Sequence, residues 1–476
     1  MISLLASLLL VYLAIVRYFR YQRLYAVQAR IRASAKEPSP SEAQSALQVA
    51  LLCDMPFFTH LGAEVALLKT YGIPSISALL LKTGEFSTER KFTKRVTDTA
   101  LLLSTFISCP LEHSPTTTES TPFLGPRSNI ALARVNWLHR HYDISNEDML
   151  YTLALFILEP MRLVARFDWR PFSPEEAKCS FLMWKDVGRR MNIEDIPETL
   201  GELEEWSREY ESTHMVASAS SHQLANMALE HLSTRVPNIP GARSLVKTVF
   251  LCMLDDQLRD AMMLCAPPKY AHILIKTVLV LRAFIVRNFK LPRFKPRRGY
   301  VVVENPPHSI DCDGHMRLHT VVRRHHPWYY PIPKGWRLVF DRLFGLTKGD
   351  LYPGAAFKCE GYRLEELGPT RFEQCMSRKF QSTSFLNSAI SRRSQRSDEG
   401  SRRTVWSTNR KTLGPLIVSF HCLLELLNLL MDRLLFFITA ISSVCVPREM
   451  FLTVSAPYHL VFEPFGWGVI SNDISV

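Results

Sequence analysis

Residues 2–16 carry no charged side chain and are followed directly by Arg17, Arg20 and Arg23. As a helix that rises about 1.5 Å per residue, this run would be roughly 23 Å long, which suits a thin bilayer of about 27 Å. A cleaved signal peptide has its basic residues before the apolar run and a small-residue cleavage site after it, and neither is present here. The run therefore predicts a retained transmembrane anchor, and the positive-inside rule places the following chain in the cytosol.

Beyond the anchor, apolar residues recur mainly at helical spacing. The 19 glycines are about 4% of the 476 residues, below the usual share of about 7%, which argues against a turn-rich β architecture. We predict an all-α fold, with a single large helical domain after an N-terminal transmembrane anchor. The predicted helices are 47–71, 88–107, 129–142, 145–160, 199–232, 241–265 and 269–289, with 108–128 as a proline-rich loop and 300–303 as the strand candidate.

Composition changes along the chain divide it into five parts. Residues 376–411 hold nine serines and nine basic residues, a composition typical of a disordered linker. Residues 415–446 are apolar but are interrupted by Glu425, Asp432 and Arg433, which leaves open a second membrane segment or an interfacial amphipathic helix. The predicted parts are the anchor with its basic flank (1–23), a hinge (24–46), the helical domain (47–372), a basic linker (373–412) and an apolar C-terminal segment of unknown role (413–476).

The net charge of +12 is concentrated in two segments. Residues 1–36 contribute +6 and residues 376–411 contribute +7, which leaves the rest of the chain at −1. Such a body lacks the broad basic face that binding to phosphates needs, so we predict no nucleic-acid partner. The ten cysteines contain no CxxC pair, which favours reduced thiols over a zinc site or a disulfide framework.

Two predicted helices carry polar residues on apolar faces. His139 follows Leu132 and Val135 at helical steps and points inward with them. In the helix 88–107, Arg95 and Thr99 share a stripe with apolar residues, and Asp98 lies beside it. From spacing alone, His139 is either a hydrogen-bonded core residue or a ligand, whereas Arg95 and Asp98 form a structural ion pair.

Six strings in order resemble one family, the fungal mpaB-type oxygenases, which are related to the bacterial rubber oxygenases (latex clearing proteins). They are KTYGIPSIS (69–77), KRVTDT (94–99), ARVNWLH (133–139), DMLYTLALFILEPMR (148–162), WSREYE (206–211), and YPG with ELGP (352–369). The resemblance extends over roughly residues 47–370 and begins after the same kind of anchor. It implies an all-α haem-binding domain at the endoplasmic reticulum membrane, in a single-pass protein whose catalytic domain faces the cytosol.

The resemblance also implies roles for individual residues. His139 would be the proximal iron ligand of haem b, Arg134 of the same string would contact the cofactor, and Arg95 and Thr99 would lie on the distal side. Asp98 occupies the position of a lysine that caps the iron in rubber oxygenases, and we group it with the catalytic residues. The acidic catalytic base of those enzymes has no clear counterpart near residue 79.

The implied activity is oxidative cleavage of a carbon–carbon double bond by dioxygen, in the prenyl or terpenoid chain of a hydrophobic small molecule made in secondary metabolism. A lipid bilayer is the other expected partner. A cytochrome P450 is excluded because the nearest string to its cysteine loop, 352–361, has Ala355 at the required glycine. The histidines between 308 and 326 are predicted to lie in a solvated loop. Two alternatives remain open: a non-catalytic helical membrane scaffold or lipid-binding protein, and a different helical metalloenzyme.

Overall fold

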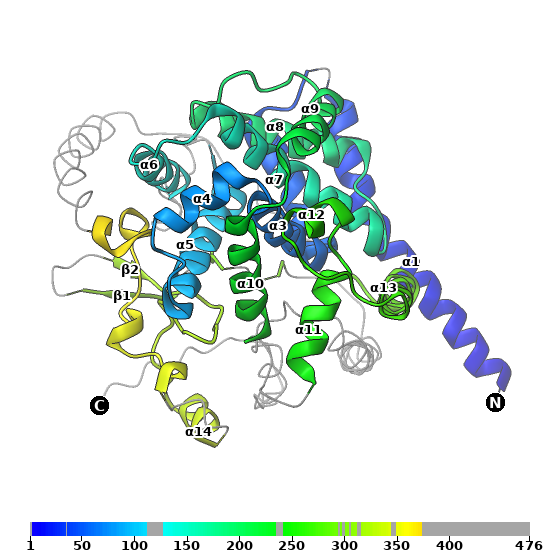
Figure 1. The fold of residues 1–476 in the computed structure, drawn as a ribbon. Helices are drawn as coiled ribbons and strands as arrows, with labels where there is room; N and C mark the ends of the chain where they lie inside the picture. Colours follow the sequence, from blue (N-terminus) through cyan, green and yellow to red (C-terminus); the bar gives the residue numbers. More distant parts are fainter. Residues whose placement is uncertain are drawn as a thin grey trace, which may run out of the picture.

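The helices of this computed structural model surround a central pair, α3 and α7 (Figure 1). The structure describes residues 2–34, 36–111, 127–234, 241–293, 296–297, 300–303, 306–311, 316–343 and 349–373. The α-helices are α1 (Ile2–Ala33), α2 (Pro40–Gln48), α3 (Pro56–Thr70), α4 (Pro74–Lys82), α5 (Glu89–Ser108), α6 (Arg127–His139), α7 (Asn146–Phe167), α8 (Pro174–Arg190), α9 (Leu200–His214), α10 (Ala219–Ser233), α11 (Ala242–Leu251), α12 (Asp256–Ala261), α13 (Lys269–Phe289) and α14 (Trp336–Leu343). A π-helical turn, η1 (Val49–Asp54), joins α2 to α3, and four 3₁₀ turns follow α14: η2 (Gly349–Leu351), η3 (Ala355–Phe357), η4 (Leu364–Glu366) and η5 (Thr370–Phe372).

The central helix α7 begins where the side chain of Ser145 accepts a hydrogen bond from the backbone N–H of Asp148. It was predicted to end at Pro160 but continues to Phe167, so this prediction was wrong. Pro160 lies where α3 comes closest, because a Cβ on Gly62 of α3 would lie 2.4 Å from the Cα of Pro160. Glycine at 62 therefore allows the two helices to pack backbone to backbone, and burial of this interface holds α7 helical across the proline.

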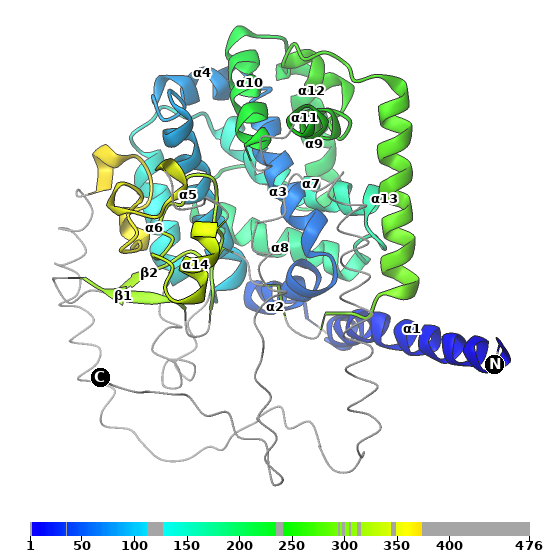
Figure 2. The same cartoon turned by 90° about the horizontal axis from the view of Figure 1, so that it is seen from below.

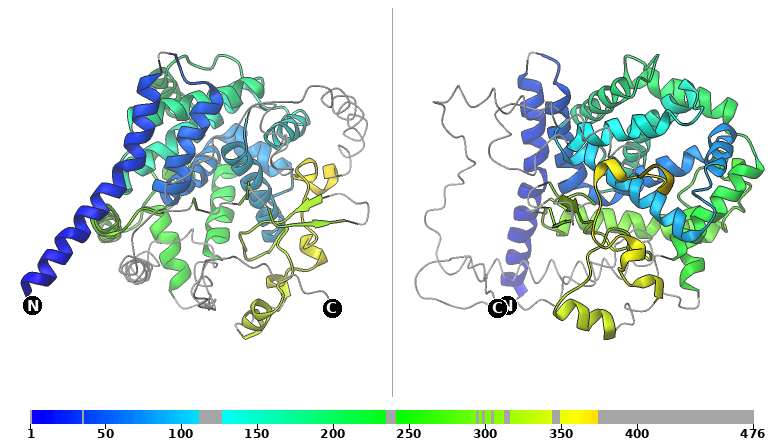
Figure 3. Two further views of the ribbon diagram at one scale, coloured as in Figure 1. Left: turned by 180° about the vertical axis from the view of Figure 1, so that it is seen from behind. Right: turned by 90° about the vertical axis from the view of Figure 1, so that its left-hand side faces the viewer.

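Other helices cover the central pair on two sides. In two views, α4, α5 and α6 lie on one side of α3 and α7, and α1 and α13 lie on the other (Figures 1 and 2). The N-terminal part of α1 extends beyond the rest of the body (Figure 3). The C-terminal part packs onto it, since Val16, Leu24 and Val27 are buried.

The all-α prediction is confirmed for the described residues, where strand structure is limited to a single two-stranded sheet and one isolated bridge. The strands β1 (His308–Ile310) and β2 (Met316–Leu318) are antiparallel, with Ser309 opposite Arg317. The strand predicted at 300–303 is not formed. The six cysteines that the structure describes are free thiols, as expected.

The predicted helix boundaries agree with the structure for some helices and differ for others. The helices 88–107 and 269–289 are confirmed as α5 and α13. The helix predicted over 47–71 is interrupted at Met55, where η1 ends and Pro56 starts α3, and the helices predicted over 199–232 and 241–265 are each two helices. The predicted hinge 24–46 is helical at both ends, which leaves residues 34–39 as the link.

Within the described residues, no single helix meets the length and hydropathy expected of a membrane span, and the segments Pro40–Asp54 and Pro56–Thr70 meet them only as a pair bent by 108°. The side chains of Leu4, Leu8, Leu9, Leu10 and Val11 in α1 are exposed. Most of the predicted loop 108–128, nearly all of the linker 373–412 and the whole segment 413–476 lie outside the described residues.

Candidate functional site

The polar stripes predicted on α5 and α6 face one cavity. Helix α5 begins where the Thr88 side chain accepts a hydrogen bond from the backbone N–H of Lys91, and α6 ends at His139 itself. The side chains of Arg95 and Thr99 from α5 and of Val135 and His139 from α6 all line this cavity. The structure therefore brings together Arg95, Thr99 and His139, although α5 and α6 are separated by a long connection.

The cavity has a volume of about 250 Å³ and mostly apolar walls. Helices α3, α4, α7 and α8 contribute the large side chains of its lining, among them Leu67, Leu80, Phe156 and Trp184. Such walls suit an apolar ligand, and the few polar side chains among them are placed to orient it.

His139 is held in its neutral form. Burial, together with the charge of Arg95, lowers the pKa of His139 to about 4. Its Nδ1 is buried and has no hydrogen-bond partner among the described residues. A neutral imidazole is the form that binds a metal ion. The described residues contain no group of three or more histidines, cysteines or acids that could hold a metal.

Arg95 and Thr99 are bonded to each other across one helical turn. The guanidinium of Arg95 donates to the hydroxyl oxygen of Thr99, and this hydroxyl donates to the backbone carbonyl of Arg95 over 2.9 Å. The predicted ion pair between Arg95 and Asp98 is not formed. Among the described residues, the hydrogen-bond partner of the Arg95 guanidinium is therefore a neutral hydroxyl instead of a carboxylate.

Asp98 holds a distant segment of the chain in the cavity wall. Its buried carboxylate accepts hydrogen bonds from Lys94 Nζ (2.8 Å), from the Tyr329 hydroxyl (2.8 Å) and from the backbone N–H of Gly368 (3.0 Å). Burial alone would lower the pKa of Lys94, but Asp98 and Glu373 raise it. With both oxygens already bonded, Asp98 positions Gly368 instead of offering a free base to a ligand.

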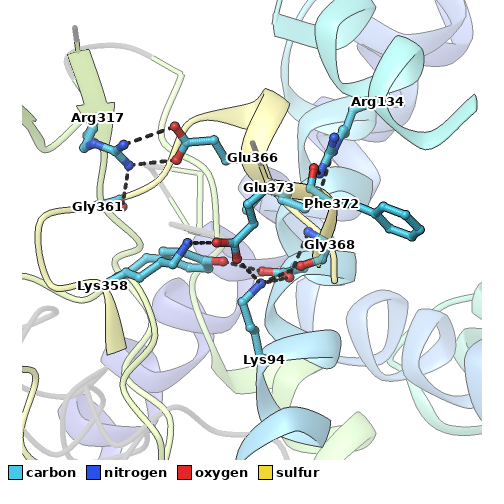
Figure 4. Close-up of polar contacts among 12 residues, drawn as sticks. Lys94, Arg134, Arg317, Lys358, Gly361, Glu366, Gly368, Phe372 and Glu373 are labelled. Carbon is cyan, nitrogen blue, oxygen red and sulfur yellow. Dashed lines mark hydrogen bonds and ion pairs between the residues drawn. The ribbon is translucent and has the colours of Figure 1, made fainter. Parts of the chain in front are cut away.

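Arg134 does not line the cavity, which argues against the predicted cofactor contact. Its buried side chain donates from Nε to the carbonyl of Leu367 over 2.7 Å and from Nη2 to that of Phe372 over 3.1 Å. Figure 4 shows this contact beside the group around Lys94, Gly368 and Glu373. Arg134 and Asp98 thus hold the same segment, 367–373, against α5 and α6.

Sequence reasoning missed several cavity residues that come from loops. Gly368 and Pro369 line the cavity, and so does Glu85, which follows α4. Gly368 has φ of +115°, and a Cβ there would lie 2.9 Å from Leu138. The string ELGP was noted only as part of the resemblance, since nothing in its spacing places it beside α6.

The histidines near 308–326 are not all solvated, so that prediction was wrong. His319 and His326 are buried. Nδ1 of His326 lies 3.1 Å from the Thr93 hydroxyl, and Nδ1 of His231 from α10 lies 3.4 Å from the same hydroxyl. These contacts pack the segment after β2 onto the side of α5 that faces away from the cavity.

A helical body surrounds an apolar cavity in which a neutral histidine lies beside an arginine and a threonine, an arrangement typical of a small-molecule site. The family model described as the ER-bound oxygenase mpaB/B'/rubber oxygenase catalytic domain matches residues 112–284. That range contains His139, whereas Arg95 and Thr99 precede it.

Curated relatives extend the match over more of the chain. The ER-bound oxygenase mpaB' of Penicillium brevicompactum is 30% identical over 399 residues, which are 78% of this chain and 89% of the relative. The ER-bound oxygenase mpaB of Penicillium roqueforti (strain FM164) is 34% identical over 277 residues, 54% of this chain and 88% of the relative. The ER-bound oxygenase mpaB of P. brevicompactum is 31% identical over 288 residues, which are 56% of this chain and 69% of the relative.

The chain belongs to the mpaB family of oxygenases. It is therefore an oxidoreductase that acts on a small-molecule substrate. This result argues against the alternative of a non-catalytic scaffold.

Proposed function

We propose that this oxygenase uses haem b to cleave a carbon–carbon double bond in a prenyl or terpenoid side chain, with dioxygen as co-substrate, in secondary-metabolite biosynthesis. The observation that carries the proposal is the position of His139. Its imidazole lines an apolar cavity, is neutral, and has an Nδ1 with no partner in the described part of the chain. Iron of a b-type haem takes such an imidazole as its ligand.

The residues present fit the cofactor. His139 would hold the iron, and apolar side chains from α3, α4, α7 and α8 would contact the macrocycle. Bound haem supplies the oxygen chemistry. The chain's own contribution is to exclude water, to orient the alkene, and to direct the Arg95 guanidinium and the Thr99 hydroxyl at negative charge that develops during the reaction.

We further propose that the body faces the cytosol, held to the endoplasmic reticulum by α1 as a single-pass anchor. The relatives are named ER-bound, and the basic residues that follow residue 16 favour this orientation. In this scheme residues 47–372 are the catalytic domain. A test by truncation should remove only residues 2–15, because Val16 and the buried residues after it pack on the body, and the product should remain folded but leave the membrane fraction.

The decisive experiment is an absorption spectrum of the purified chain, oxidised and then reduced under carbon monoxide. We expect a Soret band that shifts on binding carbon monoxide as histidine-ligated haem does, and we expect His139→Ala to abolish it. His141→Ala is the matched control, because His141 is exposed on the same turn and bonds the carbonyl of Trp137. An unchanged band in His139→Ala, or equal loss in both variants, contradicts the assignment.

A further inference from the structure

Helix α13 is apolar on both of its sides. Ala271, Ile275, Leu279 and Val286 are buried against the body. The opposite side carries six apolar side chains that are between 46% and 73% exposed, with the exposed Lys276 and Thr277 between them. The stripe, which we call the α13 stripe, consists of Tyr270, Ile273, Leu274, Val280, Leu281 and Phe284. An exposed apolar stripe of this size marks an interaction surface.

The C-terminal end of α13 contacts α1. The Tyr12 hydroxyl of α1 donates to the carbonyl of Phe289 at the end of α13 over 2.7 Å, and Arg20 donates to the carbonyl of Lys290. Figures 1 and 2 agree that the two helices cross instead of running side by side. With α1 steeply inserted in a bilayer, α13 would lie along the bilayer surface.

A group of cations lies where the two helices meet. Arg20 Nε and Arg23 Nη1 are buried without a hydrogen-bond partner among the described residues, and Arg282 Nη1 lies 3.5 Å from Asp168 Oδ1. Burial and the neighbouring Arg293, Arg282 and Arg20 lower the pKa of Lys290 to about 7. Asp54 and Asp168 are the acids that interact with this group, and they do not balance it. More cations than acids therefore gather at this junction, which fits a phosphate-bearing headgroup.

We propose that α13 is a second membrane contact: an interfacial helix whose stripe enters the lipid layer while the cations at its C-terminal end bind phospholipid headgroups. The proposal rests on the membrane association proposed above and adds a defined surface to it. It commits to lipid because α13 contacts α1, whose exposed apolar residues form the proposed anchor, and because its C-terminal end lies beside Arg20, where α1 becomes basic. Amphipathic helices with basic ends bind bilayers in this way.

The test is photo-crosslinking of the full chain in vesicles of phosphatidylcholine, with and without phosphatidylserine. The photoreactive p-benzoylphenylalanine replaces Tyr270 or Phe284 in the stripe, Leu8 in α1, or the exposed Ile310 of β1. Both views place β1 on the side of the molecule away from α13 (Figures 1 and 2). We expect lipid adducts at Leu8, Tyr270 and Phe284 and none at Ile310.

The outcomes separate the two proposals. Adducts at Leu8 without adducts in the α13 stripe would overturn the second contact and leave the anchor intact, whereas no lipid adduct at any position would overturn both. Adducts from Tyr270 or Phe284 to residues 415–446, or to a second copy of the chain, would also overturn it, since protein would then cover the stripe.

The headgroup contact has its own test. The adduct yield at Phe284 should rise when phosphatidylserine is present, and Arg293→Gln should reduce that rise by about fivefold, the effect of one charge near an anionic surface. Arg208→Gln on α9 is the matched control, because Arg208 is also exposed but lies outside α1 and α13. Equal yields with and without phosphatidylserine would refute binding of anionic headgroups.

Discussion

The substitution Asp98→Asn distinguishes a catalytic from a structural role for the acid next to Thr99. An asparagine keeps an oxygen for the Tyr329 hydroxyl but turns an NH₂ group towards Lys94 Nζ and the Gly368 N–H. Two charge-assisted contacts at Oδ2, of 2.8 and 3.0 Å, are lost. Hydrogen bonds to charged groups are worth about 1.5–3 kcal/mol each, and breaking a buried pair costs about 3–5 kcal/mol.

We therefore expect Asp98→Asn to lower the free energy of unfolding by about 3–5 kcal/mol. The loss should not exceed this range, because Lys94 keeps two other partners: the carbonyl of Gly368 at 2.6 Å and the carboxylate of Glu373 at 3.2 Å. The assay is guanidinium unfolding of the detergent-solubilised chain, followed by far-ultraviolet circular dichroism. The midpoint should fall while the denaturant slope stays constant.

Two companion variants make the result interpretable. Asp143→Asn removes an exposed carboxylate near the end of α6 and should change stability by less than about 0.5 kcal/mol. The double variant Lys94→Met/Asp98→Leu removes both charges and should recover part of the loss, because an apolar pair leaves no buried charge unpaired. A wild-type unfolding midpoint combined with lost turnover in Asp98→Asn would refute the structural role.

Three further predictions concern the cavity and the central pair of helices. The haem-free chain should lose stability as the pH falls from about 6.5 to about 4, because His139 takes up a proton in the unfolded chain but not in the folded one. Thermal melts at several pH values should show a weaker pH dependence for His139→Phe. An unchanged dependence in this variant would show that His139 is not its cause. Gly62→Ala should lower the free energy of unfolding by about 1–3 kcal/mol, because the new Cβ would clash with the backbone of Pro160. Gly201→Ala is the control, because its Cβ would point into open space, and it should leave the melting temperature unchanged. Arg95→Gln should keep the Soret band but slow turnover on the order of 10²–10³-fold, and turnover equal to wild type would remove Arg95 from the mechanism.

Periodicity predicted the parts of the site that belong to single helices. Arg95, Thr99 and His139 were placed correctly because a side chain's direction along a helix follows from its position in the repeat. The partners of Asp98 could not be predicted in this way, since Tyr329 and Gly368 lie more than 200 residues further along the chain.

Tertiary packing also overrode local signals. Pro160 reads as a helix end in isolation, but its contact with Gly62 keeps α7 continuous. Arg134 belongs to the same string as His139, yet it lies on another side of α6 and bonds Leu367 and Phe372. The shared sequence string therefore identified the family, but it did not predict the contacts of each residue within the string.

The segment that carries Gly368 and Pro369 sets the order in which the site can be completed during synthesis. The ribosome produces α3 to α8 early, but the wall they form stays open until residues 367–373 emerge and are held by Asp98, Lys94 and Arg134. Most of the domain is therefore translated before the cavity closes.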